Sequence, residues 1–116
     1  MKRSLMAAVA ACALASPVAA QNFYTGNDLL RLCESDRAAD LGICIGYVSA
    51  VFDVSRNRFC TDGLVNGRQI VDVATTALRR YPTTRHKDAD VLVELAFMAA
   101  WPCRQQNTPQ GTQRTF

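Results

Sequence analysis

The sequence contains few of the residues on which metal and redox chemistry depend. Its 116 residues include one histidine, His86, and no pair of cysteines in the spacing Cys-x-x-Cys. Zinc sites in small domains use cysteine and histidine pairs at short spacing, so zinc is disfavoured as an alternative use of the cysteines. The thiol-redox motif and the haem-attachment motif both need Cys-x-x-Cys and are therefore excluded. We expect no metal and no cofactor.

A catalytic pair of carboxylates is also missing. The ten acidic residues are scattered along the chain, as is usual for helix caps and solvated faces rather than for a general acid and base that act together. If the cysteines are bridged, His86 has no thiol nucleophile to activate. We expect that this chain is not an enzyme.

Two further deficits restrict the class of partner. The chain has 13 cations against 10 acidic residues, a net charge of +3, and removal of Lys2 and Arg3 with an N-terminal signal leaves 11 against 10, or +1. This balance gives no reason to expect a nucleic acid partner. The apolar stretch of residues 5–14 is shorter than the roughly 20 residues that a membrane-spanning helix needs. We expect no membrane association after export.

The N-terminus has the layout of a secretory signal. Lys2 and Arg3 precede the apolar stretch, and the small residues Val18-Ala19-Ala20 follow it. This order predicts a cleavable signal peptide over residues 1–20 and a periplasmic domain that starts at residue 21.

The cysteine count indicates disulfides. Cys12 lies in the signal segment, where the preceding small residues leave lipidation as an alternative to simple removal. Four cysteines then remain, Cys33, Cys44, Cys60 and Cys103. An even number in a small exported domain predicts two disulfides.

Four segments have apolar residues at helical spacing. We expect Asn27, Asn66 and Asp88 to cap the first, third and fourth helices, while Pro82 and Pro102 end the third and fourth. The expected apolar residues, helix by helix, are Leu29, Leu30, Leu32 and Cys33; Leu41, Cys44, Ile45, Val48, Val51 and Phe52; Ile70, Val73, Ala74, Ala77, Leu78 and Tyr81; and Val91, Leu92, Leu95, Ala96, Ala99 and Trp101.

Short connections between these segments favour antiparallel neighbours. The fold prediction is therefore all-α, a small four-helix antiparallel bundle stapled by two disulfides. In that topology Cys33 and Cys44 lie at one end, and Cys60 and Cys103 at the other. Only the pairs Cys33 with Cys44 and Cys60 with Cys103 avoid bridging the two ends, which are too far apart for a disulfide. The chain-entropy model assigns these bridges about 3 and 4 kcal/mol of stabilisation.

The connection between the third and fourth helices is basic and contains the only histidine. Such a run is usually a solvated helix end, but loops also carry binding residues. We therefore name a candidate partner contact, which consists of Pro82, Thr83, Thr84, Arg85, His86 and Lys87.

Two other features have competing interpretations. Gly42 and Gly46 remove side chains from one face of the second helix, which favours close packing against another helix of this chain over a dimer contact. Residues 104–116 are rich in Gln, Thr, Pro and Gly and have one large apolar residue. That composition predicts a disordered tail.

In order and spacing, several short motifs of this chain resemble those of a known family, the Rap/Tai group of periplasmic immunity proteins that protect bacteria from type VI secretion amidase toxins. The resemblance runs from Gly26 to Cys103, and members often have a proline shortly after the Phe-Cys pair, where this chain has Thr61-Asp62-Gly63. The shared motifs are Gly26-Asn27-Asp28-Leu29-Leu30 with Cys33, Cys44-Ile45-Gly46-Tyr47, Phe59-Cys60, Gln69 with Val71-Asp72-Val73, Tyr81-Pro82 with Arg85-His86, and Ala100-Trp101-Pro102-Cys103.

The resemblance implies a Rap/Tai-like helical domain over residues 21–103, often a homodimer. It implies that the chain blocks a peptidoglycan amidase by placing a loop and helix surface in its catalytic groove, and that it has no catalytic activity of its own. The rival hypothesis is a general periplasmic structural or stress-related helical protein without a dedicated enzyme target.

Overall fold

The computed structural model describes residues 23–104, and this part of the chain is helical. It contains α1 (Gly26–Cys33), α2 (Ala38–Val54), α3 (Gly67–Arg80) and α4 (Ala89–Ala100), with short 3-10 turns η1 (Arg56–Arg58) and η2 (Pro82–Thr84). The all-α class, the four helices and the two disulfides are confirmed. The expected signal peptide over 1–20, and all but the first residue of the expected tail, lie outside the described residues.

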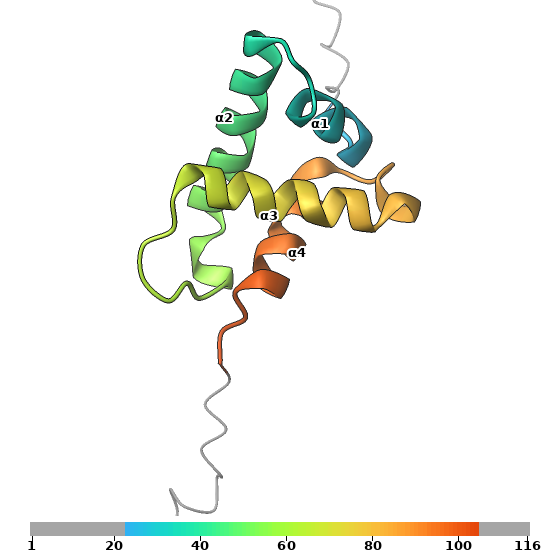
Figure 1. Ribbon diagram of the computed structural model, residues 1–116. Helices are drawn as coiled ribbons and strands as arrows, with labels where there is room; N and C mark the ends of the chain where they lie inside the picture. The colour runs from blue at the N-terminus through green and yellow to red at the C-terminus, as the bar shows by residue number, and fades with distance from the viewer. Residues whose placement is uncertain (1–22, 105–116) are drawn as a thin grey trace, which may run out of the picture.

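The four helices enclose one core, and each of them contacts the other three. Figure 1 shows α2 running down one side of the molecule, with α3 lying across it and α1 packed near the upper end of α2. The segment after α3 turns back beside α1 before α4 runs downward. This path brings the connection between α3 and α4 against the start of the first helix.

Aromatic rings form the lower part of the core. Phe97 of α4 is fully buried, and its ring centroid lies 5.3 Å from that of Phe52, 5.4 Å from that of Phe59 and 5.8 Å from that of Trp101. Burial of rings of this size contributes a large part of the stability of a small domain. The Cys60–Cys103 disulfide adjoins this cluster, and the Cys60 amide donates to the carbonyl of Trp101 at 2.9 Å.

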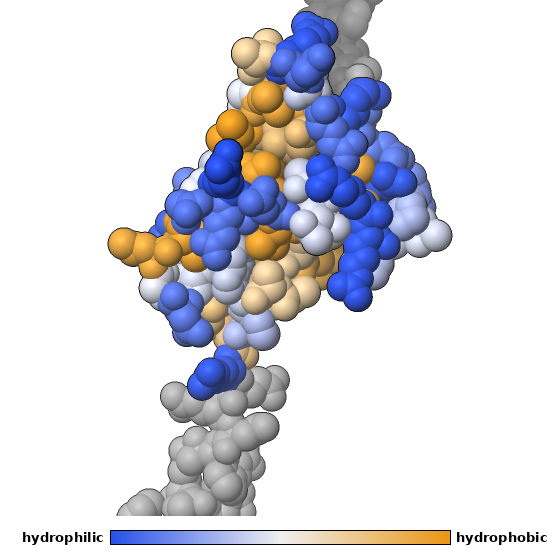
Figure 2. All heavy atoms as spheres, viewed as in Figure 1, coloured by the Kyte–Doolittle hydropathy of each residue, from blue (hydrophilic) through white to orange (hydrophobic). Residues whose placement is uncertain are grey.

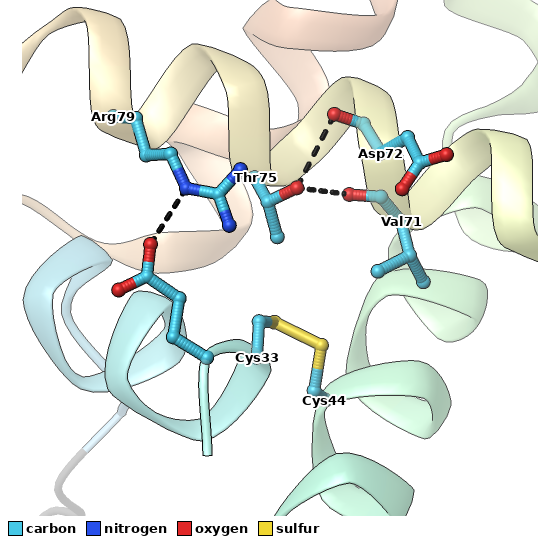
Figure 3. Close-up of a disulfide and its surroundings, with 7 residues drawn as sticks. Cys33, Cys44, Val71, Asp72, Thr75 and Arg79 are labelled. Carbon is cyan, nitrogen blue, oxygen red and sulfur yellow. Dashed lines mark hydrogen bonds and ion pairs between the residues drawn. A yellow bond between two sulfur atoms is a disulfide. The ribbon is translucent and has the colours of Figure 1, made fainter. Parts of the chain in front are cut away.

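The other disulfide joins the end of α1 to the second turn of α2, and Figure 3 shows it facing α3. Cys33 and Cys44 have their Cα atoms 5.0 Å apart, within the normal range for a disulfide. Arg79 of α3 reaches across and pairs with Glu34, Nε to Oε1 at 2.6 Å. The buried Thr75 donates its hydroxyl to the Val71 carbonyl at 2.9 Å. Both predicted cysteine pairs are thus confirmed.

The cap of α1 differs from the prediction. Thr25, not Asn27, is the N-cap, because Thr25 and Asp28 bond reciprocally: the Thr25 amide donates to Asp28 Oδ2 at 3.0 Å, and the Asp28 amide donates to Thr25 Oγ1 at 3.2 Å. Such a capping box satisfies two donors that the first turn would leave free. The hydrogen bonds from Thr25, assisted by the nearby charge of Arg31, hold the pKa of Asp28 below its ordinary value.

Of the other two predicted caps, only one forms a capping hydrogen bond. The Asn66 side chain accepts from the Gln69 amide at 2.9 Å, as expected. Asp88 occupies the N-cap position of α4 but makes no side-chain capping bond. Its backbone instead forms an isolated antiparallel bridge with Thr25, so the start of α4 is fixed by its contact with the segment before α1.

The buried stripe was predicted well for α3 and poorly for α4. Ile70, Ala74 and Leu78 are buried as expected. In α4 the expected Ala96 is buried, but the expected Val91 and Leu95 are 49% and 54% exposed and Ala99 is exposed as well. Other residues of the helix are buried in their place. The α2 prediction is also wrong at Ile45, which is 51% exposed, and that for α3 at Tyr81, which is 55% exposed. The buried residues of α4 are Ala89, Val93, Ala96 and Phe97.

Candidate functional site

The basic connection of residues 82–87 is tied to the first turn of α1 by backbone hydrogen bonds. The Gly26 amide donates to the Lys87 carbonyl at 2.9 Å, and the Asn27 amide donates to the Arg85 carbonyl at 2.8 Å. These two donors belong to the first turn of a helix, where no carbonyl within the helix is available. The connection is therefore fastened to α1 at its middle, through Arg85, and at its end, through Lys87.

Gly26 makes this contact possible, and sequence reasoning gave it no role. A Cβ at this buried position would lie 2.6 Å from Leu92 Cδ1 and 3.0 Å from the Arg85 carbonyl oxygen. The Arg85 oxygen is backbone and cannot move aside without displacing the connection. The signals in the sequence were its place immediately before the expected start of a helix and its position in the shared motif Gly26-Asn27-Asp28-Leu29-Leu30.

The candidate contact residues are mostly accessible. Thr84 and Arg85 are half-buried, and the other four, Pro82, Thr83, His86 and Lys87, are exposed. The structure therefore brings all six together on one short connection at the surface.

An apolar groove lies between α3 and α4, with a volume of about 750 Å³. We call it the α3–α4 groove. Its walls include Tyr81, Val91 and Leu95, whose side chains are 55%, 49% and 54% exposed. Figure 2 shows hydrophobic surface below α3, over α4, besides a larger area over α2. Large apolar side chains gathered at the surface in this way are typical of interaction sites.

The connection and the groove form one surface. Thr84 and Lys87 belong to the connection and also line the groove, where they lie with Arg80 of α3. The apolar side chains of the groove, which we call its floor, thus end at a rim of polar and cationic residues. Sequence reasoning identified the rim, but it assigned Val91 and Leu95 to the core and so missed the floor.

A second hollow lies on the other side of the connection. It has a volume of about 720 Å³, and its polar lining comes from α1, the turn between α1 and α2, the first turn of α2, and the connection. Arg85 lines this hollow, whereas Thr84 and Lys87 line the groove. The connection therefore separates two sites of different chemistry.

The sequence profile of the Rap1a immunity proteins matches residues 25–103. This chain belongs to the Rap1a immunity protein family. The matched region contains the four helices, both disulfides, the basic connection and both hollows. No curated protein matches the chain. As an immunity protein, the Rap1a-family chain has a protein effector as its partner.

The described part of the Rap1a-family chain lacks two features that mark other classes of protein. Within residues 23–104, no three side chains of the types His, Cys, Asp and Glu are grouped so that they could hold a metal ion. None of the helices in this part of the chain is long and apolar enough to cross a membrane.

The glycines of α2 do not have the role that the sequence favoured. A Cβ built at Gly42 or at Gly46 meets no described atom within 4 Å, so neither glycine packs against another described helix of this chain. Ile43 and Ile45 on the same helix are 43% and 51% exposed. The interpretation as packing within the chain is therefore wrong for residues 23–104, and this face of α2 is open.

Proposed function

We propose that this member of the Rap1a family acts in the periplasm and neutralises a type VI secretion effector that cleaves peptidoglycan as an amidase, by covering the active site of the effector. The family match supports an immunity function. Two disulfides are typical of proteins in an oxidising compartment, and the layout of residues 1–20 resembles a cleavable signal. The chain inhibits by binding and performs no reaction itself.

The observation that carries this proposal is the continuity of the α3–α4 groove with the connection of residues 82–87. An apolar centre bordered by polar and cationic groups is the usual composition of a protein interface. The connection is also fixed before binding, since its carbonyls already accept hydrogen bonds from α1. A surface that is ordered in advance loses little conformational entropy when a partner binds.

The open face of α2 supports a homodimer as part of the same proposal. Gly42 and Gly46 let a second backbone approach closely, and Ile43 and Ile45 supply apolar area beside them. This face belongs to a different helix from those that line the groove, so a dimer built on it leaves the groove free for the effector. Replacing Gly46 by Arg should convert a dimer to a monomer in sedimentation velocity, and an unchanged sedimentation coefficient would exclude this interface.

The experiment for the main proposal is co-expression in the periplasm with an amidase encoded beside this gene. Wild type should prevent lysis, and Leu95→Asp should abolish protection, because a charge would enter the apolar floor. Leu95 is 54% exposed, so its replacement should lower the free energy of unfolding by only about 1 kcal/mol. Binding of the purified proteins should weaken by about 2 kcal/mol or more.

Leu64→Asp is the matched control, since Leu64 is fully exposed and does not line the groove. It should protect as well as wild type. If Leu95→Asp also protects fully, the groove is not the contact. If wild type neither protects nor binds the amidase, the general structural or stress-related role becomes the better account.

A further inference from the structure

The polar hollow beside α1 is lined by more cationic than acidic side chains. Its cationic lining residues are Arg31, Arg37 and Arg85, and its acidic ones are Glu34 and Asp40. The three arginines come from α1, the turn before α2 and the basic connection. Such a concentration of guanidinium groups around one cavity favours an anionic ligand, unless each group already has an acidic partner.

Two of these arginines have acidic partners. Arg31 pairs with Asp28 at 3.0 Å, and Arg37 lies 3.7 Å from an Asp40 oxygen that also accepts from Ser35. The remaining acid, Glu34, is paired with Arg79 of α3 at 2.6 Å. Every carboxylate around the hollow is therefore already matched with an arginine.

Arg85 is the cation that remains. Its side chain makes no hydrogen bond or ion pair with any residue of the described chain, and its Nε is buried without an acceptor. The backbone of Arg85 is held by the Asn27 amide at 2.8 Å. The Arg85 side chain is therefore attached to a fixed part of the backbone that lines the hollow. Its charge is the one positive charge by which the cationic lining residues exceed the acidic ones.

The geometry points to this hollow as a binding site for a single carboxylate, which is supplied by an aspartate or glutamate side chain of the effector. A guanidinium presents two parallel donors that match the two oxygens of a carboxylate. Arg31 and Arg37 also line the hollow and add positive potential, although their own acids reduce it. One carboxylate would balance the one excess charge.

This assignment rests on the proposed function, because the acid belongs to the effector. It also explains how one short connection serves two contacts. Thr84 and Lys87 face the α3–α4 groove, and Arg85 lines the hollow on the other side. An effector that covers the connection would meet an apolar site and a carboxylate site together, which adds specificity to apolar burial.

The first test uses no effector. Purified protein is titrated with glutamate blocked at both ends as N-acetyl and N-methylamide, and backbone amide shifts are followed by NMR. Saturable shifts should appear at Asn27, at Ser35 and near Arg85. Blocked glutamine, which has the same shape without the charge, should cause none. Equal responses to both compounds would overturn the carboxylate assignment.

Variants identify the anchor. Arg85→Gln should weaken binding of blocked glutamate about tenfold, as expected for loss of a charge-assisted hydrogen bond, and Arg85→Lys should recover part of it because the charge returns without the paired donors. Arg68→Gln is the control, since Arg68 is exposed on α3 and lines neither hollow. Unchanged binding by Arg85→Gln would refute the role of Arg85.

Two further measurements identify the kind of anion that binds and test whether the effector occupies the hollow. If inorganic phosphate binds the hollow more tightly than blocked glutamate, the ligand class is wrong. Bound effector should suppress the shifts caused by blocked glutamate, and persistence of those shifts in the complex would show that the effector does not occupy the hollow. Because the first titration contains no effector, failure of the immunity hypothesis leaves its result unaffected.

Discussion

The two faces of α4 have similar composition and different environments. On the inner face, Val93 and Phe97 are fully buried against the other helices. On the outer face, Val91 and Leu95 are about half exposed and line the α3–α4 groove. A helix with large apolar side chains on two opposite faces is normally buried on both of them. Here the second side faces solvent, so the inner face serves stability and the outer face is free for the proposed contact with the effector.

The largest expected effect comes from the inner face. Phe97→Ala removes a ring that contacts three other aromatic side chains and should lower the free energy of unfolding by about 3–5 kcal/mol. Leu95→Ala on the outer face should lower it by less than about 1 kcal/mol. Urea unfolding of both variants measures the difference. Equal losses would show that the outer face is part of the core.

The next largest effect concerns the two disulfides, of which Cys60–Cys103 adjoins the aromatic cluster. Replacing Cys60 and Cys103 together by alanine should cost about 4 kcal/mol, and replacing Cys33 and Cys44 about 3 kcal/mol, because the first pair closes the longer loop. Chemical unfolding of the two double variants gives the order. A smaller loss for Cys60 and Cys103 would show that the aromatic cluster already restricts the unfolded chain at that end.

A third prediction concerns the basic connection of residues 82–87. Replacing Arg85 and His86 together by alanine should weaken effector binding by about 2 kcal/mol or more if both are central to the interface. The fold should be retained, since α1 bonds to the backbone of the connection. Calorimetry with the effector measures the affinity, and circular dichroism checks the fold. Full affinity in the double variant would make the connection ordinary solvated surface.

The smallest effect lies at the cap of α1, which holds the connection. Thr25→Ala should cost about 1 kcal/mol at neutral pH. Because the pKa of Asp28 is lowered in the folded protein, the stability that comes from its charged form is present above the unfolded pKa of about 3.9 and is lost as pH falls through the folded value. The difference between variant and wild type should therefore shrink in acid.

Asn27→Ala is the control for the cap, since the sequence alone favoured Asn27 for this role. Asn27 is exposed and lies within the helix, where alanine has the higher helix propensity. The free energy of unfolding of the Asn27→Ala variant should stay the same or rise. A loss equal to that of Thr25→Ala would restore the original assignment of the cap.

The sequence alone predicted the structure correctly where a local residue pattern is compatible with only one arrangement. The cap at Asn66 and the inner residues of α3 follow from a polar side chain before an amphipathic segment. The disulfide pairing followed from helix order, since only one pairing joined cysteines at the same end. The prediction that Asn27 caps α1 failed because Thr25, two residues earlier, is also a capping residue type, and Thr25 forms the reciprocal bond with Asp28.

The sequence by itself determined the helical class, the disulfides, the family resemblance and the cationic character of the connection between α3 and α4. These depend on residue type, spacing and order along the chain. The tertiary structure alone decided which face of α4 is buried, because the helix is apolar on both faces and periodicity cannot choose between them. It also decided that Arg85 faces one hollow while Lys87 lines another, because that division depends on how the connection packs against α1.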